Sequence, residues 1–467
     1  MAGPRGRRGP GRPSRAVRRR RRKAAVRSPA RAADGKGMAE PYGEGPTRVR
    51  ENRSEGWSAA VRRPVPGRVP GRSSAGPHPH GPIGLDLRGP PATVGREDRG
   101  DGGNAATVKR GSAMVGNSAG RAFVGSFTSA GGLGITAAAV DRDTGALTVL
   151  GSTDAVPDPS FLAIGARDGE TVLYAVGESA PGVAAAFSAD GDVPALLGSV
   201  QAVGGDGPTH LALAANHLVT ANYTSGSVTA LPVLDDGALG PASDVLRYEG
   251  SGPDPDRQEG PHAHQVLADP SGAWVVGVDL GTDAVRVCAL DPATGSLTLH
   301  GETALRPGTG PRHLAFHPSG SLAYVLGELE PVLTVCRWDA AAGRLDVLGE
   351  APVLPEDVEA ADDAGRTYPS EVVVAHDGRF LWTANRGHDS ISVLTLDESG
   401  EKAALVATVG CGGHWPRDLT LDPSGQWLYA ANERSGNVSW FAVDAQTGIP
   451  RHAGSIDVPA ASCVVLL

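Results

Sequence analysis

Ring and charged side chains recur in this sequence just after a Pro residue and just before a short apolar run. Three such segments, GPHAHQVL, GPRHLAF and WPRDLTL, contribute the side chains of His262, His264, Arg312, His313 and Arg417. Imidazoles transfer protons near neutral pH, and arginines bind phosphate or carboxylate through paired hydrogen bonds. If these side chains meet in the fold, they could hold an anionic substrate beside a proton-transfer group.

A second set of polar side chains follows the next apolar run of the same segments. It includes Glu328, Asn385 and Arg386. A carboxylate beside a histidine could take part in acid–base chemistry, and beside an arginine it could instead form a structural ion pair. Both interpretations stay open for Glu328 and for its possible partners Arg312 and Arg386.

We expect different roles for the individual histidines and no metal site. We expect only one of His262 and His264 to face a shared pocket, while the other caps the Gly-Pro turn. His313 lies beside an arginine, which favours a structural role, although it is also a candidate for contact with substrate. The Asp and His residues show no ligand spacing typical of a metal site.

The four cysteines are far apart, without a CxxC motif, and are expected to be reduced core residues.

The polar side chains belong to a unit that is repeated seven times after Ala122. Each copy contains an apolar strand, a short polar turn and a second strand, often followed by a Gly-containing hairpin and a third strand. The corresponding strand positions are spaced by about 51 residues on average, within the range for four-stranded propeller blades; they are Phe123, Tyr174, Val219, Val275, Tyr324, Trp382 and Tyr429. The repeat predicts an all-β fold, a seven-bladed β-propeller with four-stranded antiparallel blades.

Six copies are preceded by one more strand, which a Pro opens, and the first copy lacks it. The last strand of the chain, ASCVVLL, can supply the missing one and close the ring. In a propeller the first strand of each blade lies innermost, beside the central channel. The polar residues at the start of these strands should therefore converge on one pocket.

The first 113 residues differ in composition from the rest. They contain 26 Lys and Arg against 9 Asp and Glu, a net charge of +17, and their only aromatic residues are Tyr42 and Trp57. Such a segment cannot bury enough apolar surface to fold, so residues 1–113 are predicted to be disordered and residues 114–467 to form the propeller. A polyanion-binding arm, a tail without specific function and a misassigned start with true initiation at Met114 all stay open.

The sequence disfavours three classes of protein, namely membrane-spanning, secreted and nucleic-acid-binding proteins. No run of 18 apolar residues is present, and no apolar region follows the basic run from Arg18 to Lys23, which argues against a membrane span and a secretory signal and favours the cytoplasm. The remainder of the chain carries a net charge of −26, which disfavours nucleic acid as a partner of the propeller.

The motifs ANYTSGSV, GPHAHQV, GPRHLAFHPSG, YVLGELE, ANRGHDSISV and PRDLTLDPSGQWLYAANE together resemble the lactonase family of seven-bladed propellers. That family includes 6-phosphogluconolactonases and the related carboxy-cis,cis-muconate cyclases. The resemblance implies a catalytic set of His264, Arg312, Glu328 and Arg386. We expect additional substrate contacts from His262, His313, Asn385 and Arg417. Gly327 stands where the family usually has Asn before the Glu, a departure that bears on substrate preference more than on fold.

The resemblance implies hydrolysis of a sugar lactone without a metal or organic cofactor. The expected substrate is 6-phospho-D-glucono-1,5-lactone, which would give 6-phosphogluconate in the pentose phosphate pathway. We expect a monomer or a weak homodimer. A cyclase-type isomerase, a non-catalytic propeller that binds a protein partner and a lactonase for another lactone are the alternatives.

Mass spectrometry of the native protein tests the assignment of the start. If translation begins at Met114, no peptide from the basic segment is expected. Detection of a peptide that contains Arg18 to Lys23 would contradict that interpretation.

Overall fold

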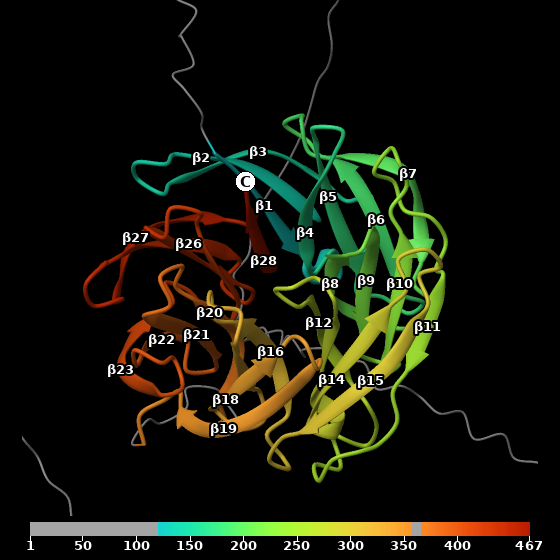
Figure 1. The fold of residues 1–467 in the computed structure, drawn as a ribbon. Coiled ribbons are helices and arrows are strands. Elements are labelled where there is room, and N and C mark those ends of the chain that lie inside the picture. Colours follow the sequence, from blue (N-terminus) through green and yellow to red (C-terminus); the bar gives the residue numbers. More distant parts are fainter. Residues whose placement is uncertain (1–119, 357–365) are drawn as a thin grey trace, which may run out of the picture. The chain divides into compact units, whose positions relative to one another are not determined.

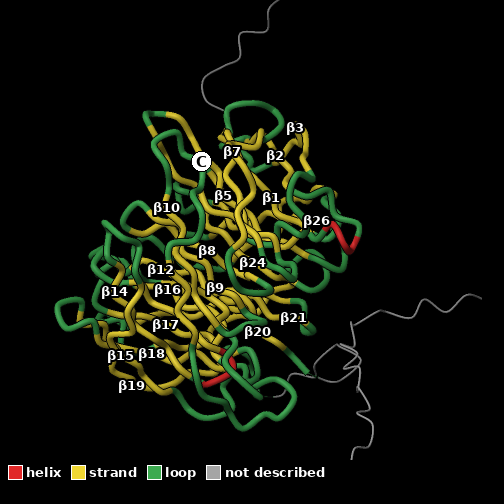
Figure 2. Tube along the Cα trace, turned by 90° about the vertical axis from the view of Figure 1, so that its right-hand side faces the viewer, coloured by secondary structure: helices red, strands yellow, loops and turns green. Residues whose placement is uncertain are grey.

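The computed structural model of the protein describes residues 120–356 and 366–467, and these form seven four-stranded antiparallel sheets around a common axis (Figure 1). Strands dominate the regular structure, and the helical turns are the short 3₁₀ segments η1 (Thr128–Ala130) and η2 (Leu280–Thr282) (Figure 2). The predicted seven-bladed propeller is confirmed. The prediction for residues 1–113 lies outside the described residues.

Each blade contributes one strand to each of four concentric layers. The innermost strands are β28 (Ala461–Leu466), β4 (Leu162–Arg167), β8 (Pro208–Ala214), β12 (Ala263–Ala268), β16 (Pro311–Phe316), β20 (Tyr368–Val374) and β24 (Pro416–Leu421). The second strands are β1 (Gly120–Ser126), β5 (Glu170–Gly177), β9 (His217–Asn222), β13 (Val275–Asp279), β17 (Leu322–Gly327), β21 (Phe380–Arg386) and β25 (Trp427–Asn432). The third strands are β2 (Ile135–Val140), β6 (Val183–Ser188), β10 (Ser227–Pro232), β14 (Ala284–Leu290), β18 (Val332–Asp339), β22 (Ser390–Leu396) and β26 (Asn437–Val443). The outer strands are β3 (Leu147–Thr153), β7 (Ala195–Ala202), β11 (Asp244–Arg247), β15 (Leu297–Ala304), β19 (Arg344–Pro352), β23 (Ala403–Gly410) and β27 (Pro450–Asp457).

The last strand of the chain completes the first blade. β28 pairs antiparallel with β1, so that Phe123 lies opposite Val465 and Val124 opposite Val464. This confirms the expectation that the ASCVVLL segment supplies the missing inner strand. The pairing covers the edge of β1, which would otherwise present free backbone groups.

The hydrophobic core lies between the blades. Seven clusters of buried side chains are found in the described part of the chain, and each combines residues from two neighbouring blades. The second strands are buried almost throughout, because a neighbouring blade covers each of their faces. The four cysteines are buried and free, as predicted.

Aromatic residues in the second strands also join neighbouring blades through hydrogen bonds. The Tyr174, Tyr324 and Tyr429 hydroxyls donate to glycine carbonyls in hairpins of the next blade, at 3.1, 2.8 and 2.9 Å. Trp382 donates in the same way from Nε1 to Gly448 at 2.7 Å. A buried ring with one polar atom therefore fixes the spacing of adjacent blades as well as filling the space between them.

No helix among the described residues is long and apolar enough to cross a membrane.

Closure by β28 yields a stability prediction. Val464 is 1% exposed at the closing interface, and Leu467, a few residues away, is 38% exposed. Val464→Asp is expected to lower the free energy of unfolding by more than about 3 kcal/mol, because it buries an unpaired carboxylate. Urea denaturation measures the change, and Leu467→Asp is the control. Equal effects of the two substitutions would contradict the closing role of β28.

Candidate active site

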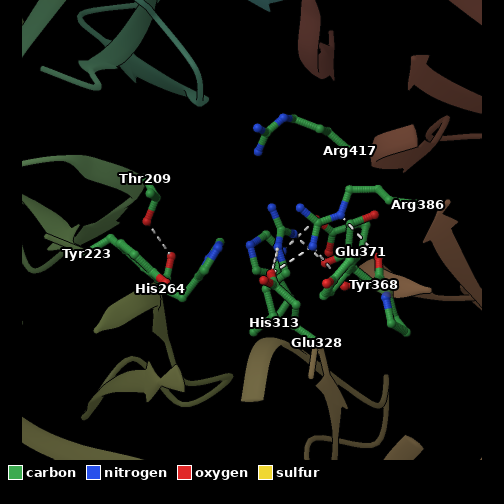
Figure 3. Close-up of polar contacts among 12 residues, drawn as sticks. Thr209, Tyr223, His264, His313, Glu328, Tyr368, Glu371, Arg386 and Arg417 are labelled. Carbon is green, nitrogen blue, oxygen red and sulfur yellow. Dashed lines mark hydrogen bonds and ion pairs between the residues drawn. The ribbon is translucent and has the colours of Figure 1, made fainter. Parts of the chain in front are cut away.

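A cavity of about 210 Å³ opens where the innermost strands begin. Its lining is mainly polar and comes from every blade. The lining residues are Phe127, Ser160, Phe161, Glu178, Thr209, Tyr223, Arg257, His264, Arg312, His313, Glu328, Arg386, Arg417 and Ser462. Residues separated by more than 300 positions in the sequence thus share one small space, and Figure 3 shows part of this group.

Irregular strand pairing directs four of these side chains. In β16 and β17, Pro311 pairs with Gly327 and His313 pairs with Leu326, so Arg312 is an extra residue that has no opposite partner. The same register shift leaves out Thr209, His264 and Arg417 in their strands. A β-bulge bends the strand and re-aims a side chain. The repeated bulge places one residue of each strand at the cavity.

The second strands deliver another set of residues at the same end. Glu178, Tyr223 and Glu328 directly follow β5, β9 and β17, and Arg386 is the last residue of β21. These positions are equivalent in their blades, which is why they converge. The lining therefore consists of residues from strand starts and from strand ends that meet at one rim.

Glu328 is the centre of a buried ion-pair network. Its Oε1 accepts a hydrogen bond from Arg257 Nη2 at 2.6 Å, and its Oε2 accepts one from Arg386 Nη2 at 2.7 Å. Arg312 Nε lies 3.2 Å from the same Oε2 as an ion pair. One carboxylate thus holds three guanidinium groups together, which neutralises part of their charge in a poorly solvated place.

This network determines the protonation of its members. Burial alone would raise the pKa of Glu328, but the positive charges of Arg386, Arg257 and Arg312 outweigh burial and hold that pKa well below the usual range of a glutamate. Burial and the neighbouring Arg386 lower the pKa of Arg312 to about 9, so this arginine stays charged at neutral pH. Glu328 is therefore a fixed anion.

Two nitrogens of the network are open to the cavity. Arg312 donates from Nη1 to Ser370 O, and Arg386 donates from Nε to Tyr368 O at 3.1 Å. Within the described residues, Arg312 Nη2 and Arg386 Nη1 make no hydrogen bond, and neither is among the buried atoms without a partner. These two nitrogens can therefore donate hydrogen bonds to a substrate oxygen.

Arg417 lies at another part of the rim. Its Nε donates to Glu433, and its guanidinium carbon lies 4.7 Å from the centre of the Phe127 ring. Its side chain is 26% exposed, compared with 6% for Arg312. In Figure 3 it stands apart from the network around Glu328. Its terminal nitrogens are suited to an anionic group that enters from solvent.

Two histidines contribute imidazoles to the lining, and a third ring lies next to them. The ring centres of His264 and His313 are 5.2 Å apart, and those of His210 and His313 are 5.3 Å apart. Burial, with help from nearby positive charge, lowers the pKa of all three well below the usual range of histidine. All three rings are therefore neutral at pH 7, and a neutral imidazole keeps one ring nitrogen with a free lone pair.

Six of the eight predicted site residues line the cavity, namely His264, Arg312, Glu328, Arg386, His313 and Arg417. His262 and Asn385 do not. The His262 ring stacks on Tyr223, with ring centres 4.5 Å apart, and so supports a residue of the lining. Asn385 Nδ2 donates to the hydroxyls of Ser390 and Ser392 at 3.1 and 2.9 Å, and so joins two strands of one blade.

The difference between the two histidines has a backbone cause. In β12 and β13, Ala263 pairs with Asp279, and it thereby takes the place that Pro311 has in the next blade. His264 is consequently the bulged residue, equivalent to Arg312. An alignment of GPHAH with GPRH on their Pro residues would instead have put His262 at the position of Arg312. The observed strand pairing differs from that alignment by two residues.

Arg257 and Tyr223 were not among the predicted site residues. Arg257 comes from the loop between β11 and β12, where the Asp254 side chain accepts a hydrogen bond from Arg257 N at 3.1 Å. That loop is not part of the repeated unit, so the sequence pattern could not predict that Arg257 reaches the cavity. Tyr223 could have been found, because it occupies the position in ANYTSGSV that Glu328 occupies in YVLGELE. Its hydroxyl accepts a hydrogen bond from Arg257 Nη2 at 3.2 Å.

No group of three or more His, Cys, Asp or Glu side chains in the described ranges is arranged to hold a metal ion. The site is instead rich in hydrogen-bond donors and proton acceptors. Its chemistry is that of an anion-binding pocket with neutral imidazoles.

The fold and the site together define a class of protein, the seven-bladed propellers with an arginine-rich pocket at one end of the propeller axis. Residues 121–466 match the family described as "Lactonase, 7-bladed beta-propeller". The chain belongs to this lactonase family.

Relatives and solved structures agree with that assignment. The chain is 33% identical over 352 residues to the 6-phosphogluconolactonase of Bacillus subtilis, an alignment that covers 74% of this chain and 97% of the relative. It is 30% identical over 338 residues to the 6-phosphogluconolactonase of Formosa agariphila, with 70% and 93% covered. The structure of the periplasmic gluconolactonase of Pseudomonas aeruginosa is similar at 28% identity and a TM-score of 0.69, with 75% of this chain and 99% of that one covered.

The ion-pair network yields a second stability prediction. Glu328→Gln is expected to cost about 3–5 kcal/mol in the free energy of unfolding at pH 7, since three guanidinium groups lose their counter-ion. The folded pKa of Glu328 lies below the unfolded value of about 4.3, so the contribution of the carboxylate is complete above that pH and is lost as the pH falls further. The difference between wild type and variant should therefore shrink at acid pH in urea denaturation.

Glu330→Gln is the matched control for this prediction. Glu330 also binds an arginine, Arg306, but its side chain is 48% exposed. Its loss is expected to cost less than about 1 kcal/mol. Equal costs for the two variants would show that Glu328 does not hold the network together.

Proposed function

We propose that the protein is a lactonase that hydrolyses 6-phospho-D-glucono-1,5-lactone to 6-phosphogluconate. The observation that carries the proposal is the convergence of four arginines and two neutral imidazoles on one cavity. Similarity to proteins named 6-phosphogluconolactonase supports the choice of substrate.

Hydrolysis of a lactone needs three contributions from the protein. The ring must be oriented, the oxygen that becomes negative must be stabilised, and a proton must be taken from the attacking water. Arg312 Nη2 and Arg386 Nη1 are the donors open to the cavity and would bind the developing oxyanion. Both arginines are held in place by Glu328, so their orientation exists before substrate binds.

The sequence left two candidates for the base, His264 and Glu328. Both oxygens of Glu328 are occupied by hydrogen bonds from arginines, so no carboxylate oxygen is left to take a proton from water, and Glu328 is a poor proton acceptor. His264 lines the cavity as a neutral imidazole. We therefore assign proton acceptance to His264 and the holding of the arginines to Glu328.

The protons balance in this assignment. The water oxygen bonds to the lactone carbonyl carbon as one water proton passes to the imidazole. The bond from that carbon to the ring oxygen then breaks, and the imidazole returns the proton to the leaving oxygen. The new carboxylic acid releases the other water proton to solution.

An anionic substituent on the substrate requires its own contact. Arg417 and Arg257 have side chains that are 26% and 35% exposed, whereas Arg312 and Arg386 are nearly buried. A phosphate is bound best by guanidinium groups whose terminal nitrogens are accessible. We assign the phosphate to Arg417, because two bonds to Glu328 and Tyr223 already occupy Arg257 Nη2.

An assay with freshly prepared 6-phosphogluconolactone, corrected for spontaneous hydrolysis, tests the proposal. Wild type should accelerate hydrolysis, and His264→Ala is expected to lower kcat by about 10²- to 10⁴-fold. His262→Ala, which changes a ring outside the lining, should keep most of kcat. Full activity of His264→Ala would refute the assignment of the base. Cyclisation of a muconate in place of lactone hydrolysis would instead favour the isomerase alternative.

The same assay separates the phosphate contact from the chemistry. Arg417→Ala should raise KM for the phosphorylated lactone by about tenfold or more, since one charged contact contributes at least 1.4 kcal/mol. It should leave KM for the uncharged glucono-1,5-lactone nearly unchanged. Similar losses on both lactones would argue against a phosphate site at Arg417.

A further inference from the structure

Three buried titratable groups, His313, Glu371 and Asp418, lie next to the residues to which the proposed reaction assigns a role, and His313 is itself part of the cavity lining. They come from β16, β20 and β24, and His313 and Asp418 each directly follow a bulged arginine. Their exposures are 2%, 7% and 4%. Burial of titratable groups costs free energy unless hydrogen bonds or ion pairs compensate it.

The contacts form a chain. His313 Nδ1 lies 2.6 Å from Glu371 Oε2, and the Glu371 carboxyl is hydrogen-bonded to the Asp418 carboxyl. Asp418 Oδ2 accepts a hydrogen bond from Val464 N at 2.8 Å. Two carboxyl groups can share a hydrogen bond only if one of them carries a proton. Glu371 and Asp418 therefore hold one proton between them.

The other end of the chain reaches the proposed base. His264 Nδ1 and His313 Nε2 are both buried without a hydrogen-bond partner, although their ring centres are only 5.2 Å apart. Unpartnered buried nitrogens on neighbouring rings are costly. A modest rotation that lets one ring donate to the other would satisfy both atoms at once.

We propose that His313, Glu371 and Asp418 form a proton-transfer chain behind His264. The chain rests on the proposed hydrolysis and adds three residues to it. As His264 takes a proton from water at its cavity side, it passes the proton on Nδ1 to His313 Nε2, and the His313–Glu371 pair holds the resulting charge. The same steps in reverse return a proton to the ring oxygen that leaves, so no proton is gained or lost.

Charge explains why such a chain would help. An imidazolium at His264 would lie beside the cations Arg312 and Arg386, and both oxygens of Glu328 are already bound to arginines. His210, the third ring of the group, is neutral and offers no compensation. Glu371 is the carboxyl group in contact with a ring of this group, at His313. Arg312 and Arg386 also act on His313, but His313 has a carboxyl partner and His264 has none among the described residues, so a proton is held at lower cost on His313.

The pH dependence of kcat in three variants tests the chain. His313→Gln is expected to lower kcat by about 10²- to 10⁴-fold with little change in KM. Glu371→Gln removes the compensating charge, so kcat should fall about tenfold and the acid limb of the profile should move to lower pH by about one unit. Asn at position 418 can donate to Glu371 and keep it ionised. Asp418→Asn should therefore move the limb in the opposite direction.

Asp269→Asn is the matched control. Asp269 is a buried carboxylate, 3% exposed, in the turn that follows β12, at the end away from the cavity. Thermal unfolding of each variant by circular dichroism separates lost stability from lost catalysis. A purely structural role of Glu371 and Asp418 would lower the unfolding temperature without moving the acid limb. The proposal would be overturned if the acid limb moved in the same direction in Glu371→Gln and Asp418→Asn, or moved in neither variant. A wild-type kcat in His313→Gln would also overturn it.

A measurement without substrate keeps the proposal separate from the proposed function. In proton NMR of the wild-type protein, the Nδ1 proton of His313 should give a strongly downfield resonance, because it is shared with a carboxylate at 2.6 Å. The resonance should vanish in His313→Gln and move upfield in Glu371→Gln. Its persistence in His313→Gln, or no such resonance in wild type, overturns the chain. If wild type hydrolyses no lactone but the resonance behaves as expected, the proposed function fails and the hydrogen-bonded chain stands.

Discussion

The antiparallel pairing of β28 with β1 is the contact on which the rest of the structure depends. Every hydrophobic cluster in the described residues is shared between two neighbouring blades, so no blade has a complete core of its own. An open ring would leave two apolar faces and one strand edge uncovered. Closure also adds Ser462 of β28 to the cavity lining, so the same pairing completes the core and the site.

Within the closed ring, one carboxylate sets the geometry of the cavity. Four arginines in a small space would repel each other strongly at low dielectric constant. Glu328 binds three of them, and Glu433 binds Arg417. The guanidinium groups are thereby fixed before any ligand arrives, while selected nitrogens stay open. This is electrostatic preorganisation, since little reorientation is needed when charge develops on a substrate.

The cavity combines two chemical kinds of group. Charged arginines and neutral imidazoles share the lining, and the Glu371 carboxyl contacts the imidazole of His313 from outside that lining. The bulges account for both kinds, because each bulge adds one residue to a strand and brings two consecutive side chains to the channel side. Arg312 and His313 are such a pair, as are Arg417 and Asp418. An uncompensated buried charge would be costly, and each arginine of the lining accordingly has a carboxylate partner.

Much of this could be read from the sequence, because the propeller repeat is local and periodic. Seven copies of one apolar pattern determined the fold, and the equivalence of their positions placed one of His262 and His264 at a shared rim with Arg312, Glu328 and Arg386. Non-periodic features could not be read in this way. The bulge register that selects His264 over His262, the loop that brings Arg257 to Glu328, and the contact of His313 with Glu371 each depend on the packing of separate blades. A repeat specifies which residues are equivalent, and only the closed tertiary structure decides which of them touch.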